Sequence, residues 1–69
     1  MIVENPDIYI GKKLIVHFND GTLFSCVGYG YSYDFDENDE EFLEFTVFSE
    51  KTGLYCDFIE KEIDSIEIK

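Results

Sequence analysis

The chain has 69 residues, which is room for one small domain spanning 1–69. A hydrophobic content of 45%, with seven Phe and five Tyr, is too high for a disordered acidic tail, so the chain is expected to fold. Sixteen acidic residues against five lysines give a formal net charge of −11, and arginine is absent. This balance argues against a nucleic-acid-binding surface, which relies on arginine and on basic patches.

The negative charge is concentrated in residues 14–50, which contain no lysine or arginine. This distribution restricts the chemistry of a partner without naming one. The acidic residues of this stretch are Asp20, Asp34, Asp36, Glu37, Asp39, Glu40, Glu41, Glu44 and Glu50.

Targeting and cysteine patterns favour a cytoplasmic protein. No apolar run approaches the roughly 20 residues of a transmembrane helix, and the N-terminus lacks a basic-then-apolar signal pattern. Cys26 and Cys56 are too few, with one histidine, for a structural zinc site, so no metal or cofactor is expected. Two buried reduced thiols are the favoured interpretation, and a disulfide between them is the alternative.

The chain begins with the pattern of one helical turn. Asn5 suits an N-cap, Pro6 the first helical position and Gly11 a left-handed C-terminal residue, with Ile8 and Ile10 as apolar anchors. An irregular extended lead-in is the alternative, because a single turn is marginal on its own.

Strand patterns then follow one another along the chain. Residues 14–18 alternate apolar and polar, Asn19-Asp20-Gly21 favours a tight hairpin, and residues 23–33 form a long second strand. Gly28 and Gly30 are two apart, so we expect them on one face of that strand, where they mark a sharp bend.

The second half of the chain repeats the pattern with shorter strands. Residues 34–41 form an acidic loop, and 42–48 alternate again with Leu43, Phe45 and Val47 on one face. A hairpin at 49–53, a fourth strand with inward residues at 54, 56 and 58, a tight connection at 60–64 and a last strand ending near residue 68 complete the order. Five such strands predict an all-β, strongly bent antiparallel small barrel with a short N-terminal helical turn.

This order of elements resembles the Sm-like barrels of the wider SH3-like group. Residues 28–38 resemble the first Sm signature, glycine-x-leucine-x-x-aromatic-Asp-x-x-x-Asn, with Gly30 in place of the leucine. The second signature, aliphatic-Arg-Gly, is Ile59-Glu60-Lys61 here. The resemblance implies the fold, and in that family the arginine helps to hold RNA, so Glu60 at its position weakens the implied activity.

Two features of the second hairpin are candidates for binding. Asp34, Asp36 and Asn38 repeat the first half of a calcium loop but lack its glycine and its last glutamate, so a solvated acidic tip is the favoured interpretation and a weak cation site the alternative. Tyr29, Tyr31 and Tyr33 alternate along the strand, so we expect their rings to form an outward-facing row on one strand face. The alternative is that some of these rings pack against the core. The predicted partner-binding residues are Tyr29, Tyr31, Tyr33, Asp34, Asp36, Glu37, Asp39 and Glu40.

No constellation for catalysis is present. His17 is the only histidine and has no nucleophile in a recognisable motif, and no phosphate-binding glycine loop occurs. We therefore expect a non-enzyme: an acidic interaction module that binds a basic protein, for example as an inhibitor or immunity-type protein. The alternative is an Sm-like RNA-binding subunit of a homo-oligomeric ring that pairs edge strands.

Overall fold

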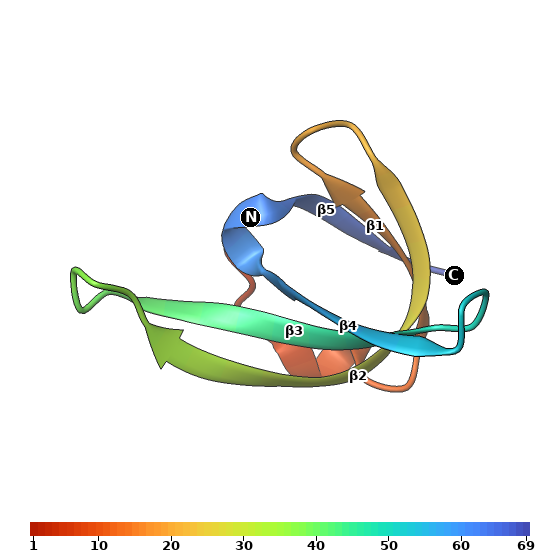
Figure 1. Ribbon diagram of the computed structural model, residues 1–69, viewed down its shortest axis with the longest axis horizontal. Helices are drawn as coiled ribbons and strands as arrows, with labels where there is room; N and C mark the ends of the chain where they lie inside the picture. Colours follow the sequence, from red (N-terminus) through yellow and green to blue (C-terminus); the bar gives the residue numbers. More distant parts are fainter.

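The fold is all-β, as the alternation predicts. The computed structural model describes residues 1–69 as one bent sheet of five antiparallel strands with two short 3-10 helices (Figure 1). No helix is long and apolar enough to cross a bilayer. The elements are η1 (Pro6–Tyr9), β1 (Lys13–Phe18), β2 (Leu23–Phe35), β3 (Glu41–Ser49), β4 (Leu54–Ile59), η2 (Glu60–Glu62) and β5 (Ile63–Ile68).

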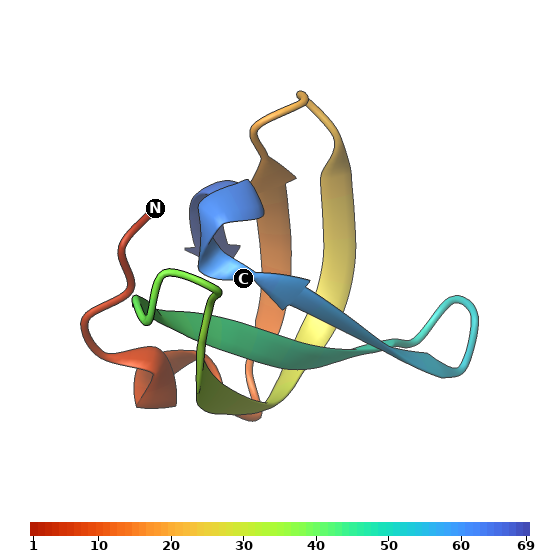
Figure 2. The same ribbon diagram turned by 60° about the vertical axis from the view of Figure 1, so that its left-hand side comes forward.

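Strand β2 organises the sheet because its two halves pair with different neighbours. Residues 23–27 pair with β1 and residues 27–35 pair with β3, which gives the strand order β4-β3-β2-β1-β5. The sheet curls so that β1 and β5 lie across from β3 and β4 (Figures 1 and 2). The two edge strands form no ladder with each other and are linked by η2, so the sheet is curled but hydrogen bonds do not close it.

The concave face of the sheet carries the core. Leu43, Phe45 and Val47 are buried on alternate positions of β3, as predicted, and the rings of Phe18 and Phe58 meet edge to face at 5.2 Å. Leu54 was predicted to face the core, and this prediction is wrong: β4 begins beyond the core, and the Leu54 side chain is 63% exposed. The apolar core consists of Val3, Tyr9, Leu14, Val16, Cys26, Leu43, Phe45, Val47, Phe58 and Ile63.

The N-terminal turn packs on the sheet through a residue that the sequence did not single out. Tyr9 is buried, whereas the predicted anchor Ile8 is 46% exposed and Ile10 is half-buried. Gly11 adopts φ +75°, as predicted, and its N–H donates to the Gly28 carbonyl at 2.8 Å. A side chain at Gly28 would collide with the Tyr9 carbonyl oxygen, so glycine is what lets η1 lie directly on β2.

Glu60 joins three parts of the chain. Its carboxylate accepts hydrogen bonds from the backbone N–H of Val3 and of Leu43, both at 3.2 Å. The N-terminal amino group donates to the Ile63 carbonyl beside it at 2.8 Å. Glu60 is thus a half-buried structural acceptor that ties the N-terminal segment and β3 to η2.

Candidate functional site

A β-bulge divides the predicted tyrosine row. The β2–β3 register shifts between Gly28 and Gly30: Gly28 lies opposite the buried Val47, and Gly30 lies opposite Thr46 on the convex face. The extra residue is Tyr29, which the bulge turns to the convex face. The expectation that Gly28 and Gly30 share a face is therefore wrong, and so is the expectation that Tyr29 shares one with the other two tyrosines.

Tyr31 and Tyr33 remain on the concave side, opposite Phe45 and Leu43. Tyr31 packs against the core, and its hydroxyl donates to Asp7 Oδ1 at 2.7 Å. This hydrogen bond to the carboxylate raises the pKa of the Tyr31 phenol. Tyr33 is 51% exposed beyond the core and meets the Tyr31 ring edge to face. The alternative prediction, that some of the tyrosine rings pack against the core, is thus confirmed for Tyr31.

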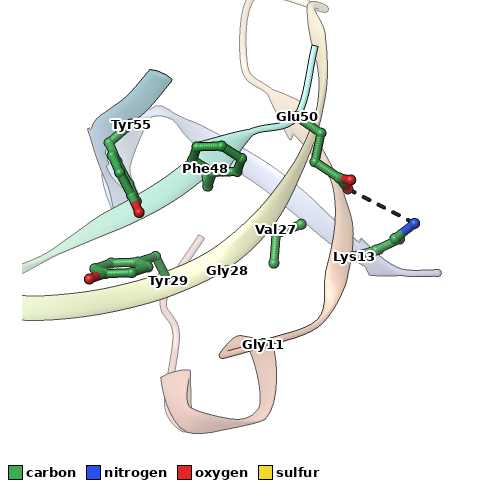
Figure 3. A pocket seen from close by; sticks show the side chains of 8 residues that line it. All are labelled: Gly11, Lys13, Val27, Gly28, Tyr29, Phe48, Glu50 and Tyr55. Atoms are coloured by element: carbon green, nitrogen blue, oxygen red, sulfur yellow. Dashed lines mark ion pairs between the residues drawn. The ribbon is translucent and has the colours of Figure 1, made fainter. Parts of the chain in front are cut away.

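On the convex face, Tyr29 joins two rings that come from other strands. Phe48 of β3 lies opposite Tyr55 of β4, and their ring centroids are 5.0 Å apart. The Tyr29 ring meets the Tyr55 ring edge to face at 4.8 Å (Figure 3). Tyr29 and Tyr55 are 62% and 58% exposed. We call Tyr29, Phe48 and Tyr55 the outer aromatic cluster.

The outer aromatic cluster borders a shallow hollow of about 400 Å³, with Val27 and two glycines, Gly11 and Gly28, on its other side (Figure 3). At the rim, Lys13 Nζ and Glu50 Oε1 are 3.9 Å apart, and both side chains are mostly exposed. The hollow is therefore an open, ring-lined depression with one ion pair at its edge.

Carboxylates continue along the convex face on the other side of the cluster. Asp57 lies beside Tyr55 on β4 and accepts a hydrogen bond from the Thr46 hydroxyl at 2.6 Å. One step further along β3, Glu44 occupies the next outward position, and its β2 neighbour is Ser32. No lysine lies on this part of β2, β3 or β4, so the cluster is bordered by negative charge.

The acidic tip of the β2–β3 hairpin is an ordered turn, not a set of free carboxylates. Asp36 Oδ1 accepts the backbone N–H of Asn38 at 2.8 Å and of Glu40 at 3.0 Å, and its Oδ2 lies 3.5 Å from Lys61 Nζ. These hydrogen bonds, the Glu40 one foremost, lower the pKa of Asp36. Asp34 Oδ1 accepts the N–H of Phe35. Asp36 therefore serves the turn itself.

The remaining predicted acidic residues, Glu37, Asp39 and Glu40, are exposed at the tip, and Asp39 takes φ +59°, which aspartate tolerates. Strand β2 extends two residues and β3 one residue further into this hairpin than predicted, which shortens the loop from 34–41 to 36–40. No group of three His, Cys, Asp or Glu side chains in the chain is arranged to hold a metal ion.

The cysteines and the histidine are separate from these surfaces. Cys26 lies on β2 and Cys56 on β4, with β3 between them, and no disulfide joins them. Both are free thiols, and burial raises the pKa of Cys26 to about 11. His17 Nε2 lies 3.4 Å from Glu67 Oε2 but forms no hydrogen bond of good geometry.

Comparison with protein-family models, curated proteins and solved structures adds no relative to this picture. The chain matches none of them. The residues themselves therefore carry the functional argument.

The sequence prediction found Tyr29 and missed Phe48 and Tyr55. The alternation of the strands could have identified both rings. Phe48 follows Val47 and Tyr55 precedes Cys56, and since Val47 and Cys56 were predicted to face inward, their neighbours face outward. Large aromatic residues at outward positions are candidates for contacts outside the chain.

Proposed function

We propose that this protein is a non-catalytic acidic binding module whose ligand is a basic protein, and that it acts in the cytoplasm. The observation that carries the proposal is the convex face of β2, β3 and β4. It combines exposed aromatic rings with the carboxylates of Glu50, Asp57 and Glu44, and its one lysine at the rim is paired.

Two further features support the proposal. Interface cores are enriched in tyrosine and phenylalanine, and complementary charge accelerates association and excludes wrong partners. The exposed carboxylates of the hairpin tip add to the negative electrostatic potential around the molecule, whose net charge is −11. A basic partner would meet negative charge on the convex face and at the tip.

The RNA-binding alternative has little to support it. Glu60 accepts two backbone hydrogen bonds where the family would present an arginine. Lys51 and Lys69 form no ion pair, but they line a neighbouring depression and not the hollow that the rings border. Base stacking on aromatic rings normally occurs beside positive charge that tracks the phosphates.

The proposal is tested by capture from a lysate at low and high salt, with light scattering for the oligomeric state of the bait. We expect captured proteins to be predominantly basic and to be lost at high salt. The variant E37Q/D39N/E40Q should capture less. The control E4Q/D64N/E67Q, which removes three exposed charges elsewhere, should capture nearly as much as the native chain.

Oligo-uridine serves as the opposing probe. Binding of oligo-uridine at low salt, combined with a captured set that is neither basic nor salt-sensitive, would overturn the proposal in favour of the RNA-binding alternative. A captured set that the two triple variants reduce equally would show that net charge alone, without a defined surface, is responsible.

A further inference from the structure

The outer aromatic cluster has ring faces that nothing in the chain covers. Tyr29 and Tyr55 are each more than half exposed, and they stand at 67° to each other, so an edge of one approaches the other and ring faces remain open to solvent. Phe48 stands at 58° to Tyr55 and is half-buried between the strands. Three differently oriented rings thus border one hollow (Figure 3).

The charges around this hollow favour a cation. Lys13 is the only cation that lines the hollow, and Glu50 lies within ion-pair distance of it. Lys51 and Lys69 line the adjoining depression, which shares Lys13 and Glu50 with the hollow. Asp57 borders the cluster on the opposite side, where its carboxylate accepts a hydrogen bond from the neutral Thr46 hydroxyl. An incoming positive charge therefore meets the negative faces of the rings, at least one carboxylate that is not ion-paired and the field of a chain with net charge −11.

We propose that the outer aromatic cluster seats a lysine or arginine side chain of the partner through cation–π contact with Tyr29 and Tyr55. The inference rests on the proposed function, because it names the side chain by which a basic partner would be anchored. The aliphatic stem of that side chain lies along Val27 and Phe48, and its charged head meets the ring faces and the rim carboxylates.

Other occupants fit the surface less well. A nucleobase could stack on the rings, but phosphates on the side of Asp57 and Glu44 would meet carboxylates and no lysine. The unpaired Lys51 and Lys69 line the adjoining depression and not the hollow itself. A purely apolar side chain would gain from the rings but nothing from the carboxylates, whose desolvation would oppose its binding. The cation uses both features.

The experiment is a titration of the full chain with short blocked peptides that differ only at a central residue: arginine, lysine, norleucine or proline. The ring-proton NMR signals of Tyr29, Phe48 and Tyr55 report the site. We expect arginine and lysine peptides to shift these signals and norleucine, which keeps the stem without the charge, to bind roughly five- to thirtyfold more weakly.

Variants locate the contact. The double variant Y29A/Y55A should abolish the shifts, and Tyr29→Phe should retain most of the affinity because the ring face persists. Tyr33→Ala removes a comparably exposed tyrosine from the concave side and should leave binding unchanged. Lys13→Met should strengthen binding by freeing Glu50. A native-like backbone amide spectrum for each variant confirms that it is folded.

The remaining outcomes overturn the inference. Equal binding of norleucine or proline peptides would make the hollow an apolar site, and ring shifts with uridine monophosphate but not with arginine would make it a base-stacking site. No shift with any probe would mean that the rings bind nothing of this kind. If salt-sensitive capture of basic proteins survives in Y29A/Y55A, the proposed function stands and this anchoring site fails. If the arginine peptide binds while capture fails, the reverse holds.

Discussion

At the scale of single residues, the carboxylates of this acidic chain divide into those that build the structure and those left for solvent. Asp36 caps the hairpin turn, Glu60 accepts from two backbone amides, and Asp20 accepts from the backbone and hydroxyl of Thr22, which lowers the pKa of Asp20. Glu37 accepts no hydrogen bond within the chain. The sequence alone does not distinguish the carboxylates that accept structural hydrogen bonds from those that face solvent. The folded backbone is needed to tell them apart.

The role of Asp36 predicts a particular dependence of stability on pH. The folded-state pKa of Asp36 lies below its ordinary value of 3.8, so the ionised side chain contributes stability above pH 3.8, and this contribution is lost as the pH falls through the folded-state pKa. Asp36→Asn keeps an acceptor oxygen but loses the charge. We expect it to unfold at lower urea concentration than the native chain at neutral pH, with the difference shrinking below pH 3.8.

The control for this experiment is Glu37→Gln, which removes a charge from the same tip without removing a hydrogen bond. Because Glu37→Gln also removes one negative charge from the tip, it measures how much stability is gained from reduced charge repulsion alone. A difference between Asp36→Asn and the native chain that stays constant across the acidic range would show that the charge of Asp36 does not stabilise the turn.

At the scale of elements, the strands could be predicted from the sequence and the bulge could not. Alternation in residues 14–18 and 42–48 gave the concave face correctly, because burial on one face imposes a period of two. The same rule applied across Gly28–Gly30 put Tyr29 on one face with Tyr31 and Tyr33, whereas the extra residue of the bulge separates Tyr29 from them. The meeting of Tyr29 with the rings of Phe48 and Tyr55 depends on that register shift and could not be predicted from the alternation.

The two glycines beside the bulge predict opposite effects of adding one methyl group. At Gly28 the new Cβ would collide with the Tyr9 carbonyl, and η1 would have to move off β2, so Gly28→Ala should lower the free energy of unfolding by about 1–3 kcal/mol. At Gly30 no atom lies within 4 Å of the new Cβ, and Gly30→Ala should leave stability unchanged or raise it by up to ~1 kcal/mol. Urea unfolding of both variants measures the contrast, and equal destabilisation would contradict the close approach at Gly28.

At the scale of the whole molecule, charge is distributed unevenly along a body of 36 × 23 × 21 Å. Lys13, Lys51 and Lys69 line one depression near the β3–β4 turn and the C-terminus, and the acidic β2–β3 hairpin projects at the opposite end (Figure 1). The concentration of acid in residues 34–41 was readable from the sequence. Its separation from the lysines was not, because it depends on the long reach of β2 and β3 past the core.

This distribution predicts that salt stabilises the folded chain. Folding brings the hairpin carboxylates together with no nearby cation except Lys61, whereas unfolding spreads the charge. Screening by sodium chloride should therefore raise the stability by on the order of 1 kcal/mol, or ~4–8 °C in Tm for a domain of this size. Chloride is the anion of choice because sulfate stabilises proteins by exclusion from their surfaces, whatever their charge.

The variant E37Q/D39N/E40Q separates hairpin repulsion from the general net charge. It leaves Asp36 and its turn hydrogen bonds in place, so it should be more stable than the native chain at low salt and gain less from added salt. The variant E4Q/D64N/E67Q removes the same charge from dispersed positions and should fall between the two. If both triple variants respond to salt identically, the repulsion belongs to the whole molecule. In that case the hairpin carries no local electrostatic strain that a basic partner could relieve.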